Sequence, residues 1–391
     1  SLALDASMVP RIAYHDATNG ALKYITRDGG DWNDPIVVDD DGFAGRYASM
    51  LLLSGDVPAV AYRAHDVEMT DYTGASSQVG TVVTSVRYAV ATDATASTWT
   101  IEDAVTGPSP CWPGACPGAS VCRTDDGLCW AVDETQCAEE CSAGQACLQD
   151  TDGAGSALVT WSCTDVVAAD AVYDLPEGIG LWNSLALSPA ADPEVVYYDR
   201  TRGELAWTTR AGGAWATPVI LDGDDLSADP TIPGDKGWHP SLAIASDGTR
   251  HVCYVDGLAE VLMYMQVDPA GTVVVREILD DGTWGGTTGK ELVGDYGTIA
   301  VDGDGRARIV YQNTSQGLVM MAVRDPSSFS WTVSIASDPA AGFMGYYIDQ
   351  AVVDGTSWIS QFTFNYEADP SYRGLRVFSC TLDSTNNAVC D

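Results

Sequence analysis

A unit of about 57 residues repeats along this chain and limits the possible folds more than any other feature. The anchor residues Ser184, Ser241 and Thr298 are spaced 57 residues apart. Thirteen residues after each anchor stands a tyrosine, and two residues later an aspartate or asparagine. Two residues before each anchor is an aromatic or imidazole ring, and four before it is a glycine. Self-similarity of this kind predicts a propeller or a solenoid.

Each unit contains four short strand-like runs. In the first unit these runs cover about 1–5, 10–15, 20–26 and 34–38, and they are separated by the turn sequences ATNG, DGG and DDDG. Val, Ile, Tyr and Trp dominate the runs, and no long apolar segment with helical period occurs. Four-stranded antiparallel units repeated head to tail predict an all-β fold, a β-propeller that covers its sheet edges by radial repetition.

Six units are readable from their anchors, and a seventh is less regular. The six anchors are Ser1, Ser49, Ser184, Ser241, Thr298 and Asp349. In the seventh, Ser120 is followed at offset seven by Gly127, and LCWAVD resembles VCYVD of a regular unit. We therefore predict a single β-propeller over 1–391 with seven blades, in which 106–178 is a disulfide-rich divergent blade. The alternative is six blades with 106–178 inserted as a cysteine-rich knob.

Cysteine usage indicates an oxidising compartment. Eight of the eleven cysteines lie between Cys111 and Cys163, which is typical of a disulfide framework, whereas the spacing offers at most one zinc half-site. The pairing stays open, and Cys253 is expected to be a buried small apolar residue. The cysteines expected in disulfides are Cys111, Cys116, Cys122, Cys129, Cys137, Cys141, Cys147, Cys163, Cys380 and Cys390.

The charge balance excludes several classes of partner. The chain has 55 acidic and 19 basic residues, a net charge of −36. Such a field repels nucleic acid and anionic lipid and favours cations. No apolar run of about 18 residues is present, so we expect no membrane insertion. Because the chain begins inside a strand pattern, we expect a mature, secreted or surface-displayed protein whose leader has been removed.

The segment SLALD followed by PRIAYHDATNGALKY resembles repeats of secreted bacterial β-propellers of the sialidase-like, BNR type, and the similarity covers most of the chain outside 106–178. This resemblance specifies an architecture better than an activity. A sialidase would imply an arginine triad, a tyrosine paired with a glutamate, and an aspartic acid. We match no triad among the arginines considered, and the repeated S-x-D-x-G-x-x-W box is absent. Those arginines are Arg11, Arg46, Arg63, Arg87 and Arg306.

Blade topology predicts which of these residues share a face. In a four-stranded meander, the loop after strand two and the link to the next blade lie at the same end. That end collects a ring of aromatic groups and a set of aspartates, which together suit a glycan or a protein ligand. The predicted ligand-binding residues are Tyr47, Trp182, His239, Tyr296, Tyr347, Asp16, Asp66, Asp199 and Asp256.

The links between blades are also rich in oxygen ligands of the kind that calcium prefers. The predicted metal-binding residues are Asp39, Asp41, Asp222, Asp224 and Asp280. Calcium is the one cofactor we expect.

From these features we favour a non-catalytic binding protein over an enzyme. Its ligand, a glycan or a partner protein, would sit at the acidic, aromatic-rimmed face. Two alternatives remain, a sialidase-like glycoside hydrolase and a structural or adhesive subunit of an extracellular assembly.

Overall fold

All regular structure in the described part of the chain is β-strand. The computed structural model describes residues 1–71, 78–112, 115–118, 120–125, 127–151, 159–167, 176–223, 235–283, 289–337, 343–364 and 374–391. Within these ranges no helix has the length and apolarity needed to cross a membrane. The chain divides into two compact units, residues 1–181 with 199–201 and residues 182–198 with 202–391.

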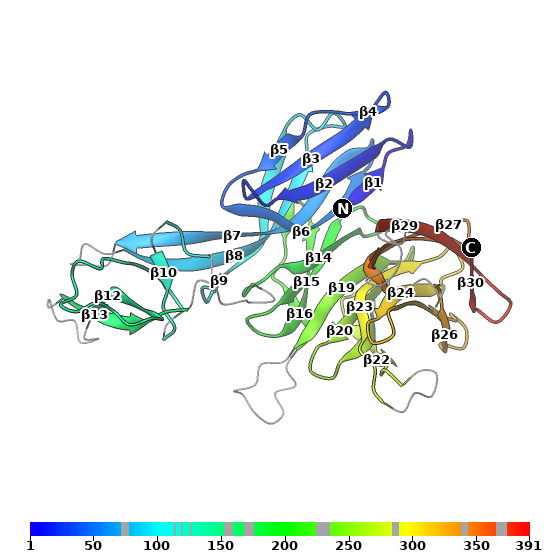
Figure 1. Cartoon of the computed structure of the whole chain (residues 1–391). Helices are drawn as coiled ribbons and strands as arrows, with labels where there is room; N and C mark the ends of the chain where they lie inside the picture. Colours follow the sequence, from blue (N-terminus) through cyan, green and yellow to red (C-terminus); the bar gives the residue numbers. More distant parts are fainter. Residues whose placement is uncertain are drawn as a thin grey trace. The chain divides into compact units, whose positions relative to one another are not determined.

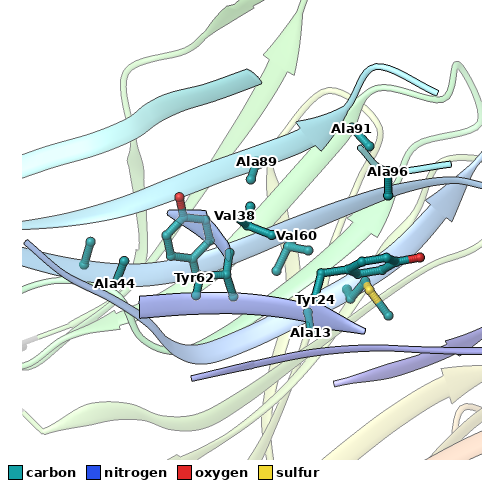
Figure 2. Packing of buried hydrophobic residues seen from close by; sticks show 12 residues of the cluster. Ala13, Tyr24, Val38, Ala44, Val60, Tyr62, Ala89, Ala91 and Ala96 are labelled. Atoms are coloured by element: carbon teal, nitrogen blue, oxygen red, sulfur yellow. The ribbon is translucent and has the colours of Figure 1, made fainter. Parts of the chain in front are cut away.

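Unit 1 contains two antiparallel blades (Figure 1). The strands of the first are β1 (Leu2–Leu4), β2 (Pro10–Asp16), β3 (Ala21–Asp28), β4 (Asp31–Trp32) and β5 (Ile36–Asp39). The strands of the second are β6 (Phe43–Leu53), β7 (Val57–Asp71), β8 (Gln78–Ala91) and β9 (Trp99–Ser109). Figure 2 shows the rings of Tyr24 and Tyr62 among small side chains, chiefly alanines, of both blades, where all are buried. Small residues let the two sheets approach closely around the two rings.

Unit 2 contains four blades in chain order. The strands of the first two are β14 (Leu181–Leu187), β15 (Pro193–Asp199), β16 (Glu204–Ala211), β17 (Ala214–Trp215) and β18 (Val219–Asp222), then β19 (Lys236–Ile244), β20 (Arg250–Asp256), β21 (Val261–Val267) and β22 (Val273–Asp280). Those of the last two are β23 (Val293–Val301), β24 (Ala307–Asn313), β25 (Leu318–Arg324) and β26 (Trp331–Ile335), then β27 (Phe343–Val353), β28 (Thr356–Phe364), β29 (Gly374–Leu382) and β30 (Ala388–Cys390).

The fold is thus an all-β β-propeller with six blades, and the prediction of seven is wrong. The cysteine-rich stretch contributes strands, but they do not make a four-stranded sheet of their own. Strands β10 (Ser120–Cys122) and β11 (Cys129–Ala131) extend the second blade, because Cys129 pairs with Gly80 of β8. Strands β12 (Gln145–Thr151) and β13 (Val159–Asp165) form a separate hairpin. Figure 1 shows β10 to β13 at the far end of the long strands β7 and β8.

All ten cysteines predicted to form disulfides do so. The pairs are Cys111–Cys122, Cys116–Cys129, Cys137–Cys147, Cys141–Cys163 and Cys380–Cys390. Cys253 is free and fully buried in β20, and burial raises the pKa of its thiol to about 12. A thiol with so high a pKa is unreactive at neutral pH.

The repeated serine joins neighbouring blades through their first strands. The hydroxyl oxygens of Ser1, Ser184 and Ser241 each accept a hydrogen bond from a backbone N–H in the following blade. The donor is the residue just after the next anchor, and the distances are 3.0, 3.0 and 3.1 Å. The donors are Met50, Leu242 and Ile299. The serine therefore recurs once per blade because each one bonds to the first strand of the blade that follows it.

The repeated tyrosine makes a second link between blades. The hydroxyl of Tyr311 donates to the carboxylate of Asp280 at 2.7 Å, and that of Tyr62 donates to Asp39 at 2.6 Å. Tyr254 donates to Asp222 in the same way. Each aspartate ends the last strand of the preceding blade. Burial and the nearby carboxylate raise the pKa of Tyr311 well above its ordinary value, so its hydroxyl remains a donor at neutral pH.

We predict that Tyr311→Phe lowers the free energy of unfolding by about 1–3 kcal/mol, because it deprives a buried carboxylate of its hydroxyl donor. Tyr62→Phe should cost less, since Asp39 keeps the Arg87 guanidinium at 2.9 Å. Urea unfolding followed by tryptophan fluorescence measures both. Tyr347→Phe is the control, because that side chain is 69% exposed. A loss no larger for Tyr311→Phe than for the control would contradict a stabilising role of this link.

Candidate functional site

The aromatic residue two positions before each anchor has a left-handed backbone. The φ angles are 54° at Tyr47, 49° at Trp182, 49° at His239, 53° at Tyr296 and 54° at Tyr347. A side chain with a Cβ costs about 1–2 kcal/mol in this conformation. In β6, β19, β23 and β27 the pairing register shifts on both sides of the residue that precedes the ring, as in a β-bulge, and the ring residue lies within the second shift. Bulges re-aim side chains, and here they turn one ring per blade out of the regular alternation.

The glycine two residues before each ring is required by close packing. Gly237 has φ 119°, and a Cβ there would lie 3.0 Å from the Cα of Leu205 in the preceding blade. At Gly45 the corresponding distance, to the Cα of Leu22, is 2.8 Å. Both the backbone conformation and the available space therefore exclude a side chain.

Four of the five predicted rings form a continuous strip in unit 2. The ring centroids of Trp182 and His239 are 4.4 Å apart, those of His239 and Tyr296 are 4.8 Å apart, and those of Tyr296 and Tyr347 are 5.1 Å apart. We call these four residues the aromatic strip. Each comes from a different blade, and the strip ends at the exposed ring of Tyr347. Tyr47, the fifth predicted ring, belongs to unit 1.

Two carboxylates that the sequence did not single out lie beside the aromatic strip. Asp235 accepts a hydrogen bond from the Tyr198 hydroxyl at 2.5 Å and another from the indole N–H of Trp238, whose ring lies 5.6 Å from that of Trp182. Asp295 precedes Tyr296 and accepts a hydrogen bond from the Thr314 hydroxyl at 2.8 Å. Its charge acts on both His239 and Tyr296.

Burial keeps the polar groups of the aromatic strip uncharged. It lowers the pKa of His239 to about 4, although the negative charge of Asp295 acts in the opposite direction. It raises the pKa of Tyr296 to about 12, helped by Tyr347 and Asp295. At neutral pH His239 is therefore a neutral imidazole and Tyr296 a neutral phenol, and both groups stack on apolar faces and exchange hydrogen bonds.

A buried amide next to the strip lacks hydrogen bonds. Asn183 follows Trp182 in β14 and is 8% exposed, and neither its Oδ1 nor its Nδ2 has a hydrogen-bond partner among the described residues. An unsatisfied buried polar group costs about 1–3 kcal/mol. Such groups are rare in native structures and are often found at functional sites.

The aspartates predicted to bind a ligand are mostly held by their own turns. Asp16 accepts from the backbone N–H groups of Thr18 and Asn19 and pairs with Lys23 at 2.6 Å, which holds the pKa of its carboxyl well below its usual range. Asp66 accepts from the N–H of Val67, and Asp256 from those of Leu258 and Ala259. Asp199 is buried at the end of β15.

The aspartates predicted to bind calcium have other partners. Asp39, Asp222 and Asp280 accept the tyrosine hydroxyls that link the blades. Asp41 pairs with Arg87 at 3.5 Å, and Asp224 lies outside the described residues. In the described ranges, the sets of three side chains close enough to share a metal consist of disulfide cysteines. Calcium stays a prediction.

Unit 1 contains a basic cluster around Tyr47. Arg63 is almost fully buried and donates to the carbonyl oxygens of Ile179 at 3.1 Å and Glu177 at 2.5 Å, while its Nη1 has no hydrogen-bond partner among the described residues. Arg46 pairs with it in the β6–β7 register and is exposed. Arg200 lies 3.5 Å from the Glu177 carboxylate.

These three arginines act on one hydroxyl. Burial raises the pKa of Tyr47, and the charges of Arg63, Arg46 and Arg200 lower it in part. We call Tyr47 and the three arginines the basic cluster. The sequence suggested two of these arginines and missed Arg200, because no motif joins it to the others. The other arginines considered, Arg11, Arg87 and Arg306, are paired with aspartates elsewhere.

Comparison with known proteins identifies similar folds but no family. No protein-family model and no curated protein matches the chain. A GH43 β-1,3-galactosidase is similar over 97% of this chain and 96% of its own, with 8% identity and a TM-score of 0.39. The intramolecular trans-sialidase of Ruminococcus gnavus is similar over 92% of this chain and 88% of its own, with 12% identity and a TM-score of 0.40. An α-L-arabinofuranosidase of Lactobacillus brevis is similar over 88% of this chain and 92% of its own, with 10% identity and a TM-score of 0.40.

Several of the similar structures are glycoside hydrolases by name. This finding contradicts the prediction of a non-catalytic binding protein and agrees better with the glycosidase alternative.

The low pKa of His239 predicts a loss of stability in acid. Between pH 6.5 and about 4 the unfolded chain binds a proton at this residue that the folded chain does not, so stability is complete above pH 6.5 and falls toward pH 4. We expect His239→Asn, which tolerates a left-handed backbone, to remove about 1–3 kcal/mol of this pH dependence. Urea midpoints between pH 7.5 and 4.5 measure it. Equal slopes in variant and parent would show that His239 titrates normally in the folded protein.

Proposed function

We propose that this chain is a glycoside hydrolase that binds its sugar chain along the aromatic strip. The observation that carries the proposal is the contact of four rings from four consecutive blades, with two carboxylates beside them. Aromatic faces stack on the C–H faces of pyranose rings, and carboxylates accept hydrogen bonds from sugar hydroxyls. A strip that is built blade by blade suits an extended chain better than a compact ligand.

Asp235 and Asp295 are the carboxylates we assign to the chemistry. Glycoside hydrolysis uses one carboxylic acid to protonate the leaving oxygen and one carboxylate to act on the sugar or on a water molecule. The two hydrogen bonds donated to Asp235 fix its orientation, as the carboxylate role requires. Asp295 accepts a hydrogen bond from the Thr314 hydroxyl and directly precedes Tyr296 of the strip, and we assign it the role of proton donor.

A kinetic comparison of three variants tests this assignment. We expect Asp295→Asn and Asp235→Asn each to lower kcat at least 100-fold on a polysaccharide or nitrophenyl glycoside that the parent cleaves, because each removes an acid or base group. Tyr347→Ala should chiefly raise KM, since this ring only binds sugar. Asp304→Asn, an exposed acid in a turn remote from the strip, is the control. Parent-like kcat in both strip variants would exclude this site from catalysis.

The basic cluster supports a second candidate function, hydrolysis of a sugar that carries a carboxylate. In a chain with a net charge of −36, three arginines around one tyrosine are a local exception that attracts anions. Arginine binds carboxylate through two parallel hydrogen bonds, and the unpartnered Nη1 of Arg63 is available for one of them. This candidate places substrate at Tyr47 in unit 1.

Substrate charge distinguishes the two candidates. If the basic cluster is the site, Arg46→Ala should lower kcat/KM at least 10-fold on nitrophenyl sialoside or glucuronide and leave neutral glycosides unaffected, since Arg46 is exposed and its loss should not unfold the protein. Arg276→Ala, a half-exposed arginine that pairs with Asp222, is the matched control. A parent that cleaves neutral glycosides alone, with no effect of Arg46→Ala, would exclude the second candidate.

Five disulfides are consistent with a location outside the cytoplasm. We infer an enzyme that acts on glycans outside the cell. Calcium at the blade links and assembly with other extracellular subunits remain proposals.

A further inference from the structure

A cavity of about 290 Å³ lies between the two middle blades of unit 2. Its walls are the turns after β19 and β23, parts of β20 and β21, and the segment that follows β25. The side chains that define its chemistry are Ser246, Asp247, His251, Gln266, Arg324 and Phe329. This volume is just below the range of about 300–1,000 Å³ that holds drug-sized ligands, so the cavity suits one small ring.

Phe329 at the rim has a left-handed backbone, and the turn itself does not require an aromatic residue at this position. Its φ is 59°, its side chain is 61% exposed, and its N–H donates to the carbonyl of Asp325 at 2.9 Å. In the neighbouring blades the turn is one residue shorter, and the left-handed position just before its closing residue holds Gly271 and Asn386, with φ 89° and 63°. Those residues fit the left-handed region with little strain, whereas an exposed phenylalanine adds cost without burying apolar area.

Phe329 is held against a buried arginine. The guanidinium of Arg324 lies 5.1 Å from the centroid of the Phe329 ring and 5.1 Å from that of Tyr264, so it is stacked between two aromatic groups. Arg324 is 7% exposed, and its Nε lies 3.5 Å from the carboxylate of Glu277. The guanidinium supports the inner side of the Phe329 ring and donates hydrogen bonds in a fixed plane.

The cavity is polar but not cationic. Glu277 offsets the charge of Arg324, and Asp247 adds a negative charge to the wall. His251 bonds to the Tyr264 hydroxyl at 2.8 Å, and burial lowers its pKa to about 4, so it is neutral at pH 7. Together with Gln266 these groups supply donors and acceptors in several directions beside one exposed ring face. That combination recognises a neutral polyhydroxylated ring, because hydroxyls exchange hydrogen bonds with the walls while C–H groups stack on Phe329.

We propose that this cavity is a second carbohydrate site, which binds a single uncharged pyranose residue with Phe329 as its stacking platform. It lies at the opposite end of the strands from the aromatic strip, because His239 is near the start of β19 and the cavity begins at Ala245, just after β19 ends. The proposal goes beyond the glycosidase function and does not rest on it: the cavity binds sugar whether or not the strip is catalytic.

The turn offers a substitution that separates binding from folding. Phe329→Asn places at this left-handed position a residue type that tolerates it, as Asn386 does before the closing residue of the shorter turn in the next blade, so we expect stability equal to or greater than that of the parent. The probes are the methyl glycosides of galactose, glucose, mannose and glucuronic acid. Ligand-observed NMR titration should show millimolar binding of at least one neutral glycoside to the parent and at least 10-fold weaker binding to Phe329→Asn.

Two further variants locate the bound sugar. Gln266→Leu should weaken the same glycoside at least threefold, whereas Tyr347→Ala, which truncates the exposed end of the aromatic strip, should leave it unchanged. Binding that is lost in Tyr347→Ala and retained in Phe329→Asn would place the sugar on the strip and overturn the proposal. A parent that binds none of the four probes at 20 mM, or that binds only the glucuronide, would overturn it as well.

Discussion

Hydrogen bonds that cross from one blade to the next set the geometry of this protein. A serine hydroxyl accepts from the first strand of the following blade, and an aspartate at the end of a blade accepts from a tyrosine of the next blade. Both hydrogen bonds can form only when each sheet has the same position relative to the sheet before it. The first strands, and with them the residues two positions before each anchor, consequently recur at regular intervals within a unit.

Because the blades are regular, the strained ring residues of successive blades lie next to one another and form a continuous surface. A single left-handed aromatic residue would be an isolated outlier, but the same bulge in successive blades brings Trp182, His239, Tyr296 and Tyr347 into ring contact. The strain at each ring is offset by the sheet that surrounds it, which pairs normally on both sides of the bulge. The chemistry proposed here depends on this repetition, since no single blade carries more than a fragment of the aromatic strip.

The sequence predicted most features that recur in every blade and few of the features that occur in one blade only. The blades, the aromatic positions and the ten paired cysteines follow from spacing alone. The described residues form six blades and no seventh, because β11, which lies within LCWAVD, pairs with β8 instead of starting a new sheet. Arg200 and Asp235 were missed because contacts between distant segments place them at their clusters. Phe329 was missed because no sequence motif marks a left-handed phenylalanine in a turn that is one residue longer than those of the neighbouring blades.

The disulfides stabilise the cysteine-rich stretch and the last hairpin, whereas the contacts between blades are noncovalent. Four of the five bridges are confined to residues 111–163, the fifth closes the terminal hairpin of the last blade, and none joins one blade to another. The cysteine-rich stretch is thus fastened covalently to itself, while the blades cohere through apolar contact and hydrogen bonding. Reduction would loosen the cysteine-rich stretch and leave the sheet interfaces in place. Its effect would still reach the basic cluster, because Trp112, next to the Cys111–Cys122 bridge, packs its ring against the guanidinium of Arg63 at 5.2 Å.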